Sequence, residues 1–387
     1  MRLALLLILG FFAGLPGVRA AEWTLIQHEG REYVSFDNMA QFYGLSAVRR
    51  VNNSGVMTYG TRSLRGEAGS PDFFINNLKF ILSYPVAEIG GHLCVSRMDL
   101  VKVIEPVLRP SRIKGAELVD TIILDPGHGG HDLGAQGGGG REKDYALDTA
   151  NRARLRLLQA GFKVELTRST DVFIPLEERV AIANRFPNAL FVSIHFNSSG
   201  SGTGIETYTL APRGVPSMMA DGPRVSDGQN CPGNVRDAEN MALATATHAS
   251  VIVRCHMFDR GIKRARFVVI RDVTIPGVLI EGGFLSNPYD AGLIAQPAYR
   301  ENLAAAIVDA ATNYRRAVSG SAAPLVTQNP NLPPVQPPPP IAMGPAGVNM
   351  VSTGKGKTAD PKRTAKTIAT DAAVAASAAR VPTLSTN

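Results

Sequence analysis

Cysteine and tryptophan are scarce in this chain of 387 residues, which contains 3 cysteines and 1 tryptophan. Three cysteines are too few for a framework of several disulfides, so the fold must depend on a packed core. Cys231 and Cys255 leave one bridge open, and free buried thiols are the alternative. Cys94 lies far from both in the sequence.

The chain also lacks an apolar run of about 20 residues, the length that spans a bilayer. The apolar stretch 3–13 follows Arg2 and precedes small residues at Val18 and Ala20. This pattern predicts a secretory signal peptide over residues 1–20 with cleavage after Ala20. No cysteine follows that point closely, so a lipoprotein anchor is not indicated. We therefore expect an exported protein, periplasmic or at the cell surface, without a transmembrane anchor.

Two further patterns are missing, and their absence narrows the function. The chain has no H-E-x-x-H helix, which is typical of common metalloproteases. It has no recognisable nucleic-acid-binding module, and export argues against a nucleic-acid partner. The net charge of +7 is instead suited to anionic polymers of the cell wall.

What is present is a set of apolar runs that each end in a chemically useful residue. The run from Thr121 leads through Asp-Pro-Gly into His128, a second run ends in His195, and a third ends in Glu281. Glu142 lies just before a helical pattern that we expect over residues 144–160, with Asp144 as its N-cap. Because the carboxyl ends of strands gather at one edge of an open α/β sheet, these residues can converge.

Two histidines and one carboxylate are a common ligand set for catalytic zinc, and they leave one position open for water. His128, Glu142 and His195 are thus candidate zinc ligands, and Glu281 is a candidate general base. Each residue also has a plainer explanation. A single histidine is often structural, and Glu142 can be a solvated carboxylate at a helix start.

Six blocks of the sequence, in order and spacing, make the resemblance specific: DPGHGG, GREKD, SIHFNSS, GIETY, DRGIK and VLIEGGFLSNP. Together they resemble the zinc-dependent N-acetylmuramoyl-L-alanine amidases of the amidase-3 family. The resemblance places the zinc ligands at His128, Glu142 and His195 and the catalytic glutamate at Glu281. It implies hydrolysis of the amide between N-acetylmuramic acid and L-alanine in peptidoglycan by a zinc-activated water, for wall remodelling or daughter-cell separation. It leaves open whether an activator protein is needed.

The alternation of strands and helices predicts an α/β fold with a largely parallel sheet covered by helices on both faces. We expect a small α+β domain at 22–109, a linker at 110–118 and the catalytic domain at 119–316. The first of these loosely resembles the stalk domains related to the amine-oxidase N-terminal module. Residues 317–387, rich in proline and then basic, lack the apolar content for a core and are predicted to be disordered.

The sequence also predicts the local structure or the role of several other residues. Residues 267–270 are predicted to form a strand, and the Pro/Gly-rich stretch 212–235 a loop that lines the substrate or is loose. His248, Cys255 and His256 lie on one predicted helix but too far apart to hold one ion, so we interpret them as structural. Asn197 can support a ligand, contact the substrate or make a local turn. Arg168, Arg179 and Arg260 are expected mainly in structural ion pairs or wall contacts.

Two other functions stay open at this point. A zinc peptidase that cuts the stem peptide would use similar chemistry. A non-catalytic wall-binding protein would be expected to have lost one of the four residues, whereas all four are present.

Overall fold

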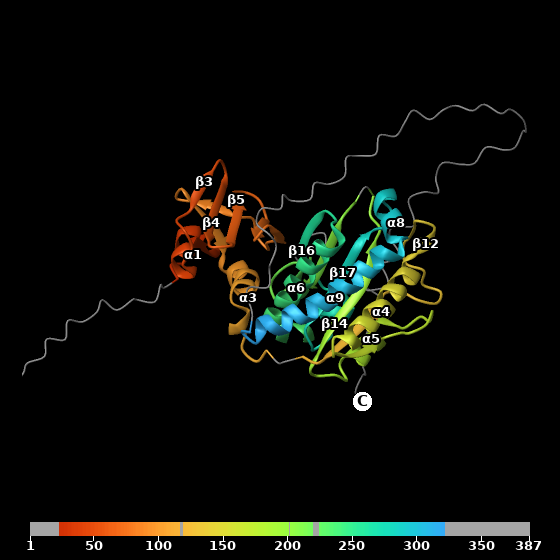
Figure 1. Cartoon of the computed structure of the whole chain (residues 1–387). Coiled ribbons are helices and arrows are strands. Elements are labelled where there is room, and N and C mark those ends of the chain that lie inside the picture. The colour runs from red at the N-terminus through yellow and green to blue at the C-terminus, as the bar shows by residue number, and fades with distance from the viewer. Residues whose placement is uncertain (1–22, 117–118, 201, 220–223, 322–387) are drawn as a thin grey trace, which may run out of the picture. The chain divides into compact units, whose positions relative to one another are not determined.

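The structure is a computed structural model, and it describes residues 23–116, 119–200, 202–219 and 224–321 (Figure 1). The predicted signal peptide and almost all of the predicted tail lie outside the described residues. No helix in the described ranges is both long and apolar enough to cross a membrane.

The catalytic half of the chain is built on a mixed sheet. Four neighbouring strands, in the order β13-β10-β14-β17, run parallel, and β15 is antiparallel to β17 and parallel to β16. The strand bounds are β10 (Thr121–Pro126), β13 (Lys163–Leu166), β14 (Ala189–Asn197), β15 (Ile205–Leu210), β16 (Asp259–Ala265) and β17 (Gly277–Phe284). The predicted α/β fold is therefore confirmed.

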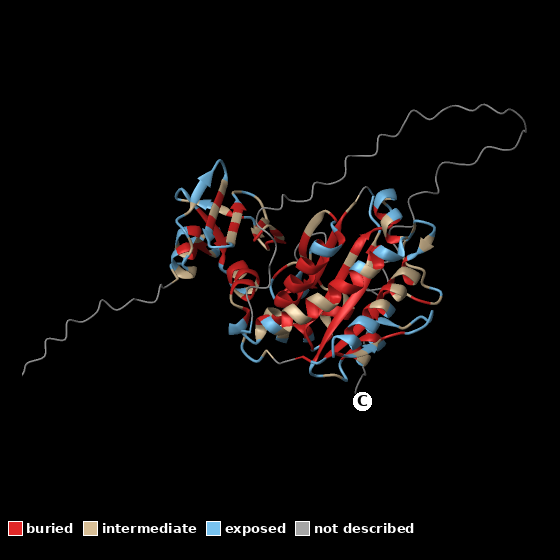
Figure 2. Ribbon diagram, viewed as in Figure 1, coloured by how far each residue is buried: buried red, intermediate tan, exposed pale blue. Residues whose placement is uncertain are grey.

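Helices cover both faces of this sheet, and its central strands are accordingly almost entirely buried and mainly apolar. One face packs against α4 (Glu142–Gln159), α6 (Asp237–Cys255) and α9 (Pro297–Val318), and α9 lies between the other two (Figure 1). The opposite face packs against α5 (Leu176–Ala183) and α7 (Val268–Arg271). The short helix α8 (Pro288–Ile294) follows β17. Figure 2 shows the buried residues concentrated in the strands and on the inner sides of these helices.

The N-terminal part contributes a separate antiparallel sheet and an extension of the large one. The separate sheet has the order β1-β2-β9-β8, while β3 to β7 continue the large sheet beyond β16. At the junction, Phe80 pairs with Ile262, and the backbone N of Lys79 donates to Oδ2 of Asp259 at 3.0 Å. The bounds are β1 (Ile26–His28), β2 (Arg31–Ser35), α1 (Phe36–Tyr43), β3 (Arg49–Val51), β4 (Ser54–Tyr59), β5 (Arg62–Glu67), β6 (Asp72–Ile75), β7 (Leu78–Ile81), β8 (Ala87–Ile89), β9 (His92–Ser96), α2 (Arg97–Asp99), η1 (Leu100–Ile104), α3 (Glu105–Leu108) and η2 (Pro110–Arg112).

Two local predictions were wrong. The expected strand at 267–270 is the short helix α7, because β16 already ends at Ala265 and the apolar side chains of Val269 and Ile270 are buried by a helical turn instead. Short apolar runs cannot be assigned to strand or helix from their pattern. The helix expected from Asp144 begins at Glu142, which places that carboxylate in the first helical turn.

The stretch 212–235 forms no long helix among its described residues. It contains two 3-10 turns, η3 (Val225–Gly228) and η4 (Pro232–Arg236). An ion pair of 2.9 Å joins Arg266, just after β16, to Asp227 in η3 and fixes this part of the loop to the sheet.

Candidate active site

Three adjacent parallel strands deliver the predicted site residues to one edge of the sheet. In the register of β10, β14 and β17, Pro126 lies beside Ile194 and His195 lies beside Glu281. His128 follows β10 directly, and Glu142 is the first residue of α4. The structure thus brings together the ends of strands that are more than 60 residues apart in the chain.

A tight turn after β10 aims the His128 side chain. His128 has a φ of 58°, in the left-handed region that non-glycine residues rarely adopt, so the turn is held by its surroundings. The backbone of Gly129 exchanges hydrogen bonds with that of Asp132, with N···O distances of 2.9 and 3.1 Å. Nδ1 of His128 is 2.8 Å from Oδ2 of Asp132, and this contact fixes the orientation of the ring.

The neighbouring glycines leave room for the cluster. A Cβ atom on Gly127 would lie 2.3 Å from the ring of His195. A Cβ atom on Gly134 would lie 2.6 Å from Oε2 of Glu142 and 2.7 Å from the ring of His128. Side chains at these two positions are therefore excluded by the close packing of the histidines and the carboxylate.

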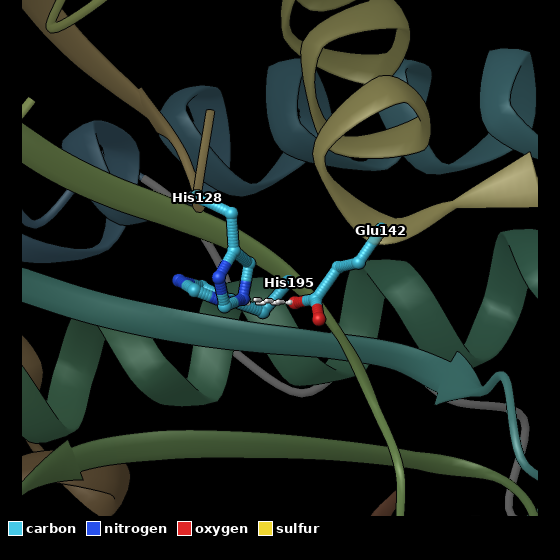
Figure 3. A group of neighbouring side chains, drawn as sticks. All are labelled: His128, Glu142 and His195. Carbon is cyan, nitrogen blue, oxygen red and sulfur yellow. Dashed lines mark hydrogen bonds and ion pairs between the residues drawn. The ribbon is translucent and has the colours of Figure 1, made fainter. Parts of the chain in front are cut away.

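His128, Glu142 and His195 form a compact cluster (Figure 3). Oε1 of Glu142 is 3.0 Å from Nε2 of His128 and 2.9 Å from Nδ1 of His195. One potential ligand atom from each residue lies within 4.8 Å of the other two. Nitrogen and carboxylate oxygen are donors that suit zinc, and Asp132 supplies the outer carboxylate that commonly orients a ligating histidine. The residues present therefore fit a zinc ion.

Glu142 is not a solvated carboxylate, since only 4% of its surface is exposed. Burial by itself raises the pKa of a carboxyl group, but hydrogen bonds from the two histidines hold the pKa of Glu142 well below its usual range. Its oxygens also accept hydrogen bonds from the backbone N of Phe196 at 3.0 Å and of Ala135 at 2.8 Å. Glu142 is thus held ionised and fixed in place.

The same contacts favour a proton on His128. Burial lowers the pKa of an imidazole, but hydrogen bonds to Glu142 and Asp132 outweigh it and raise the pKa of His128 to about 8. A metal ion must displace that proton before it binds.

Glu281 lies beside this cluster in a different electrostatic environment. Its Oε2 atom is buried and has no hydrogen-bond partner among the residues that the structure describes. Burial, followed by the charges of Glu142 and Glu206, raises the pKa of Glu281 well above its usual range, and Lys263 opposes this effect. Glu206 lies directly opposite Glu281 in the pairing of β15 with β17.

Glu206 is a residue of this site that the sequence analysis did not single out. It is 2% exposed, and it forms ion pairs of 2.5 Å with both Arg260 and Lys263. The hydroxyl of Tyr208 donates to it at 2.7 Å. Its position in the GIETY block, two residues before Tyr208 on the same face of a strand, was the available signal.

The catalytic half of the chain is similar to known enzymes. The family model for N-acetylmuramoyl-L-alanine amidase matches residues 122–313. The N-acetylmuramoyl-L-alanine amidase AmiA of Escherichia coli is 32% identical over 250 residues, which are 58% of this chain and 86% of AmiA. The chain belongs to this amidase family.

Further members of the family align over a similar region. The N-acetylmuramoyl-L-alanine amidase LytC of Bacillus subtilis is 34% identical over 208 residues, which are 53% of this chain and 38% of LytC. The solved catalytic domain of the amidase CwlV from Bacillus (Paenibacillus) polymyxa is 32% identical, with a TM-score of 0.42, and the match covers 51% of this chain and 98% of that one.

The three arginines expected in structural contacts are found in them. Arg179 forms a buried ion pair of 2.8 Å with Asp125, and Arg168 donates to the backbone carbonyls of the turn after β10. Arg260 is paired with Glu206. Asn197 makes the local contact that was one of its alternatives, because its Oδ1 accepts from the backbone N of Ser198 at 2.7 Å.

The competing histidine and cysteine residues make structural contacts. His248 is fully buried, and its ring nitrogens lie 2.9 Å from Oγ1 of Thr207 and 2.8 Å from Oδ1 of Asp259. In the described residues Cys94, Cys231 and Cys255 are free thiols, so the alternative of a Cys231–Cys255 bridge is not realised.

Proposed function

We propose that the chain hydrolyses the amide between N-acetylmuramic acid and L-alanine in peptidoglycan with a zinc ion held by His128, Glu142 and His195. The observation that carries the proposal is the cluster of these three residues beside an unpaired carboxylate, Glu281. Membership of the amidase family supports the choice of substrate.

Zinc bound at this cluster would polarise the amide carbonyl and lower the pKa of water at the site toward about 7. Two neutral imidazoles and one carboxylate leave the ion a net charge of about +1, which preserves its Lewis acidity. Asp132 keeps the ring of His128 oriented, and the backbone N of Phe196 and of Ala135 hold Glu142.

Glu281 acts as the general base and then as the general acid. It takes a proton from the attacking water and delivers it to the nitrogen of the leaving L-alanine. Burial raises its pKa, and a raised pKa suits a carboxylate that must accept a proton in the first step and return it in the second. Glu206, paired with two cations, stays ionised because hydrogen bonds and charges from Lys263 and Arg260 outweigh its burial and lower its pKa.

The proposal is tested by the products. Purified protein loaded with zinc and incubated with peptidoglycan should release peptides that begin with L-alanine, identified by mass spectrometry. Removal of the metal with a chelator should abolish release, and added zinc should restore it. Peptides that begin at a later stem residue would instead identify a zinc peptidase.

Because peptidoglycan lies outside the cytoplasmic membrane, we further propose that the chain is exported by the leader at residues 1–20. Intact-mass measurement of the extracytoplasmic protein should show a mature N-terminus at about residue 21. For the N-terminal part, 22–109, we propose a spacer or wall-targeting role like that of the stalk modules it loosely resembles.

A further inference from the structure

An exposed apolar patch lies next to the zinc-ligand cluster. Val172 and Phe173, on the segment between β13 and α5, are 44% and 42% exposed, and Leu176, the first residue of α5, is 47% exposed. The ring of His131, which is also exposed, packs against that of Phe173 with a centroid distance of 4.3 Å and an angle of 40°. We call these four residues the aromatic patch.

The patch is fixed to the turn that carries His128. Oδ1 of Asp171 accepts from the backbone N of Gly130 at 2.8 Å. The buried ammonium of Lys143 donates to Oδ2 of Asp171 at 2.6 Å and to the carbonyl oxygen of Gly130 at 2.7 Å. A Cβ atom on Gly129 would lie only 2.1 Å from the carbonyl oxygen of Val172, so the two segments are in close backbone contact. The position of the patch relative to the metal ligands is therefore rigid.

The strand order determines the order in which the site residues lie across the edge of the sheet. From one edge the order is β13, β10, β14, β17, β15, so His195 on β14 lies between the His128 turn and Glu281. His195 and Glu281 share the face of the sheet that packs against α5, because Phe191 and Leu279, an even number of residues away, are buried in the core on that side. The aromatic patch is thus on the same face as the site, on the side away from Glu281.

Glu281 must face the leaving nitrogen, since it protonates that atom. The stem peptide would then extend past β17 toward β15 and β16, where two cations, Arg260 and Lys263, share the single carboxylate of Glu206 and leave an excess of positive charge that suits its carboxylates. The acyl half of the amide, which carries the sugar through its lactyl group, extends the opposite way, toward His131 and Phe173.

We propose that the aromatic patch is a subsite for the muramic acid ring and the glycan strand attached to it. This inference rests on the proposed function and adds the direction in which the substrate crosses the metal. A pyranose presents a face of C–H groups, and a rigid exposed aromatic ring beside a reaction centre is suited to pack against it. Binding there would position the lactyl carbonyl and contribute to turnover of substrates that carry the sugar.

The test compares two substrates with the same peptide: a disaccharide-linked muropeptide and the corresponding lactoyl-L-alanyl peptide without sugar. For Phe173→Ala, we expect the ratio of the two kcat/KM values to shift about tenfold against the muropeptide, the size of one aromatic contact. Phe173→Tyr should preserve the ratio. Peptide-free disaccharide should inhibit the wild type competitively and Phe173→Ala more weakly.

Leu158→Ala is a matched control, because Leu158 is 45% exposed but lies 16 residues along α4 from Glu142, a rise of about 24 Å. It should leave the ratio unchanged. Melting temperature and zinc content establish that each variant is folded and loaded. An unchanged ratio in folded Phe173→Ala would overturn the subsite, whereas wild-type protein that cleaves neither substrate would contradict the proposed function itself.

Discussion

Two buried carboxylates on the central sheet have opposite surroundings. Asp125, in β10, is 1% exposed, and its oxygens accept hydrogen bonds from Thr167 at 2.6 Å, Ser193 at 2.8 Å and Arg179 at 2.8 Å. Glu281, on β17, has a buried oxygen, Oε2, that finds no hydrogen-bond partner within the described ranges. A buried charge is expensive unless it is paired, so the surroundings of Asp125 stabilise the fold, whereas those of Glu281 suit the proton transfer that we propose for it.

The pKa values express the same contrast. Burial alone would raise the pKa of Asp125, but Arg179 and the hydroxyls of Thr167 and Ser193 outweigh it and lower that pKa. For Glu281, burial and the nearby carboxylates raise the pKa. The first group therefore stabilises the fold above the ordinary titration range of aspartate and loses this effect as the pH falls. The second group favours folding only when it is protonated, so its effect on stability becomes unfavourable as the pH rises.

The largest effect is expected from the proposed zinc ligands, which resemble neither the paired carboxylate of Asp125 nor the carboxylate of Glu281. His195→Ala and His128→Ala should each lose both zinc and activity, because two remaining ligands form an incomplete site. Elemental analysis of the purified variants measures the metal. Full zinc content in His195→Ala would remove His195 from the ligand set.

Glu281→Gln should separate chemistry from binding. The amide has nearly the same size but cannot accept a proton near neutral pH, so activity should fall at least about a hundredfold. Zinc content should match the wild type, and metal-free stability should be unchanged or higher, because an unpaired carboxylate has been removed. Loss of zinc from this variant would instead make Glu281 a ligand.

Arg179→Met should lower the stability of the fold, whereas Glu281→Gln should lower activity and leave stability unchanged or higher. It leaves Asp125 buried without its cation, which typically costs about 3–5 kcal/mol of unfolding free energy. Denaturant unfolding of the metal-free protein measures the loss. Arg179 contacts the backbone of His128 as well, so the metal content of folded protein should be checked in parallel. Stability equal to the wild type would contradict the inference that Asp125 stabilises the fold through its pairing with Arg179.

The pH dependence of zinc binding tests the electrostatics of the cluster. Because the pKa of His128 is raised to about 8, a proton competes with zinc below that pH. Zinc affinity should therefore fall about tenfold per pH unit below 8 from this one group and level off above it. Competition with a chelator of known affinity, measured from pH 6 to 9, gives the slope. Asp132→Asn removes one cause of the raised pKa of His128, so zinc affinity should level off at a lower pH than in the wild type.

Much of this arrangement could be predicted from the sequence. The runs before His128, His195 and Glu281 indicate buried strands, and parallel strands bring their carboxyl ends together. What the sequence could not give is pairing between distant segments. The contact of Phe80 with Ile262, which joins the N-terminal strands to the large sheet, depends on tertiary packing and has no local pattern.

The partners of individual side chains could not be predicted from the sequence either. Glu142 looks like an ordinary acidic residue at a helix start, and only the fold shows that both histidines and the backbone of Phe196 surround it. For Glu206, the GIETY block indicates a strand face shared with Tyr208, but nothing in the sequence predicts its ion pairs with Arg260 and Lys263. The helix at 268–271 could not be distinguished from a strand, because the four apolar residues at 267–270 fit either.

The smallest predicted effect concerns the individual hydrogen bonds to Asp125. Ser193 is the partner of Oδ2 in the described part of the chain, whereas Oδ1 accepts from both Thr167 and Arg179. Ser193→Ala should therefore leave one carboxylate oxygen without a partner and cost about 1–3 kcal/mol of unfolding free energy. Thr167→Val keeps the shape of the side chain and leaves Oδ1 with Arg179, so it should cost only about 0.5–1.5 kcal/mol. Both variants should also raise the pKa of Asp125, so their losses should begin at a higher pH than acid unfolding of the wild type. Chemical unfolding of the metal-free proteins at pH 7 measures the two losses, and acid unfolding below about pH 4, the ordinary pKa of aspartate, measures the shift in the pKa of Asp125. Equal losses in the two variants would mean that the oxygens of Asp125 share their partners more evenly than these contacts indicate.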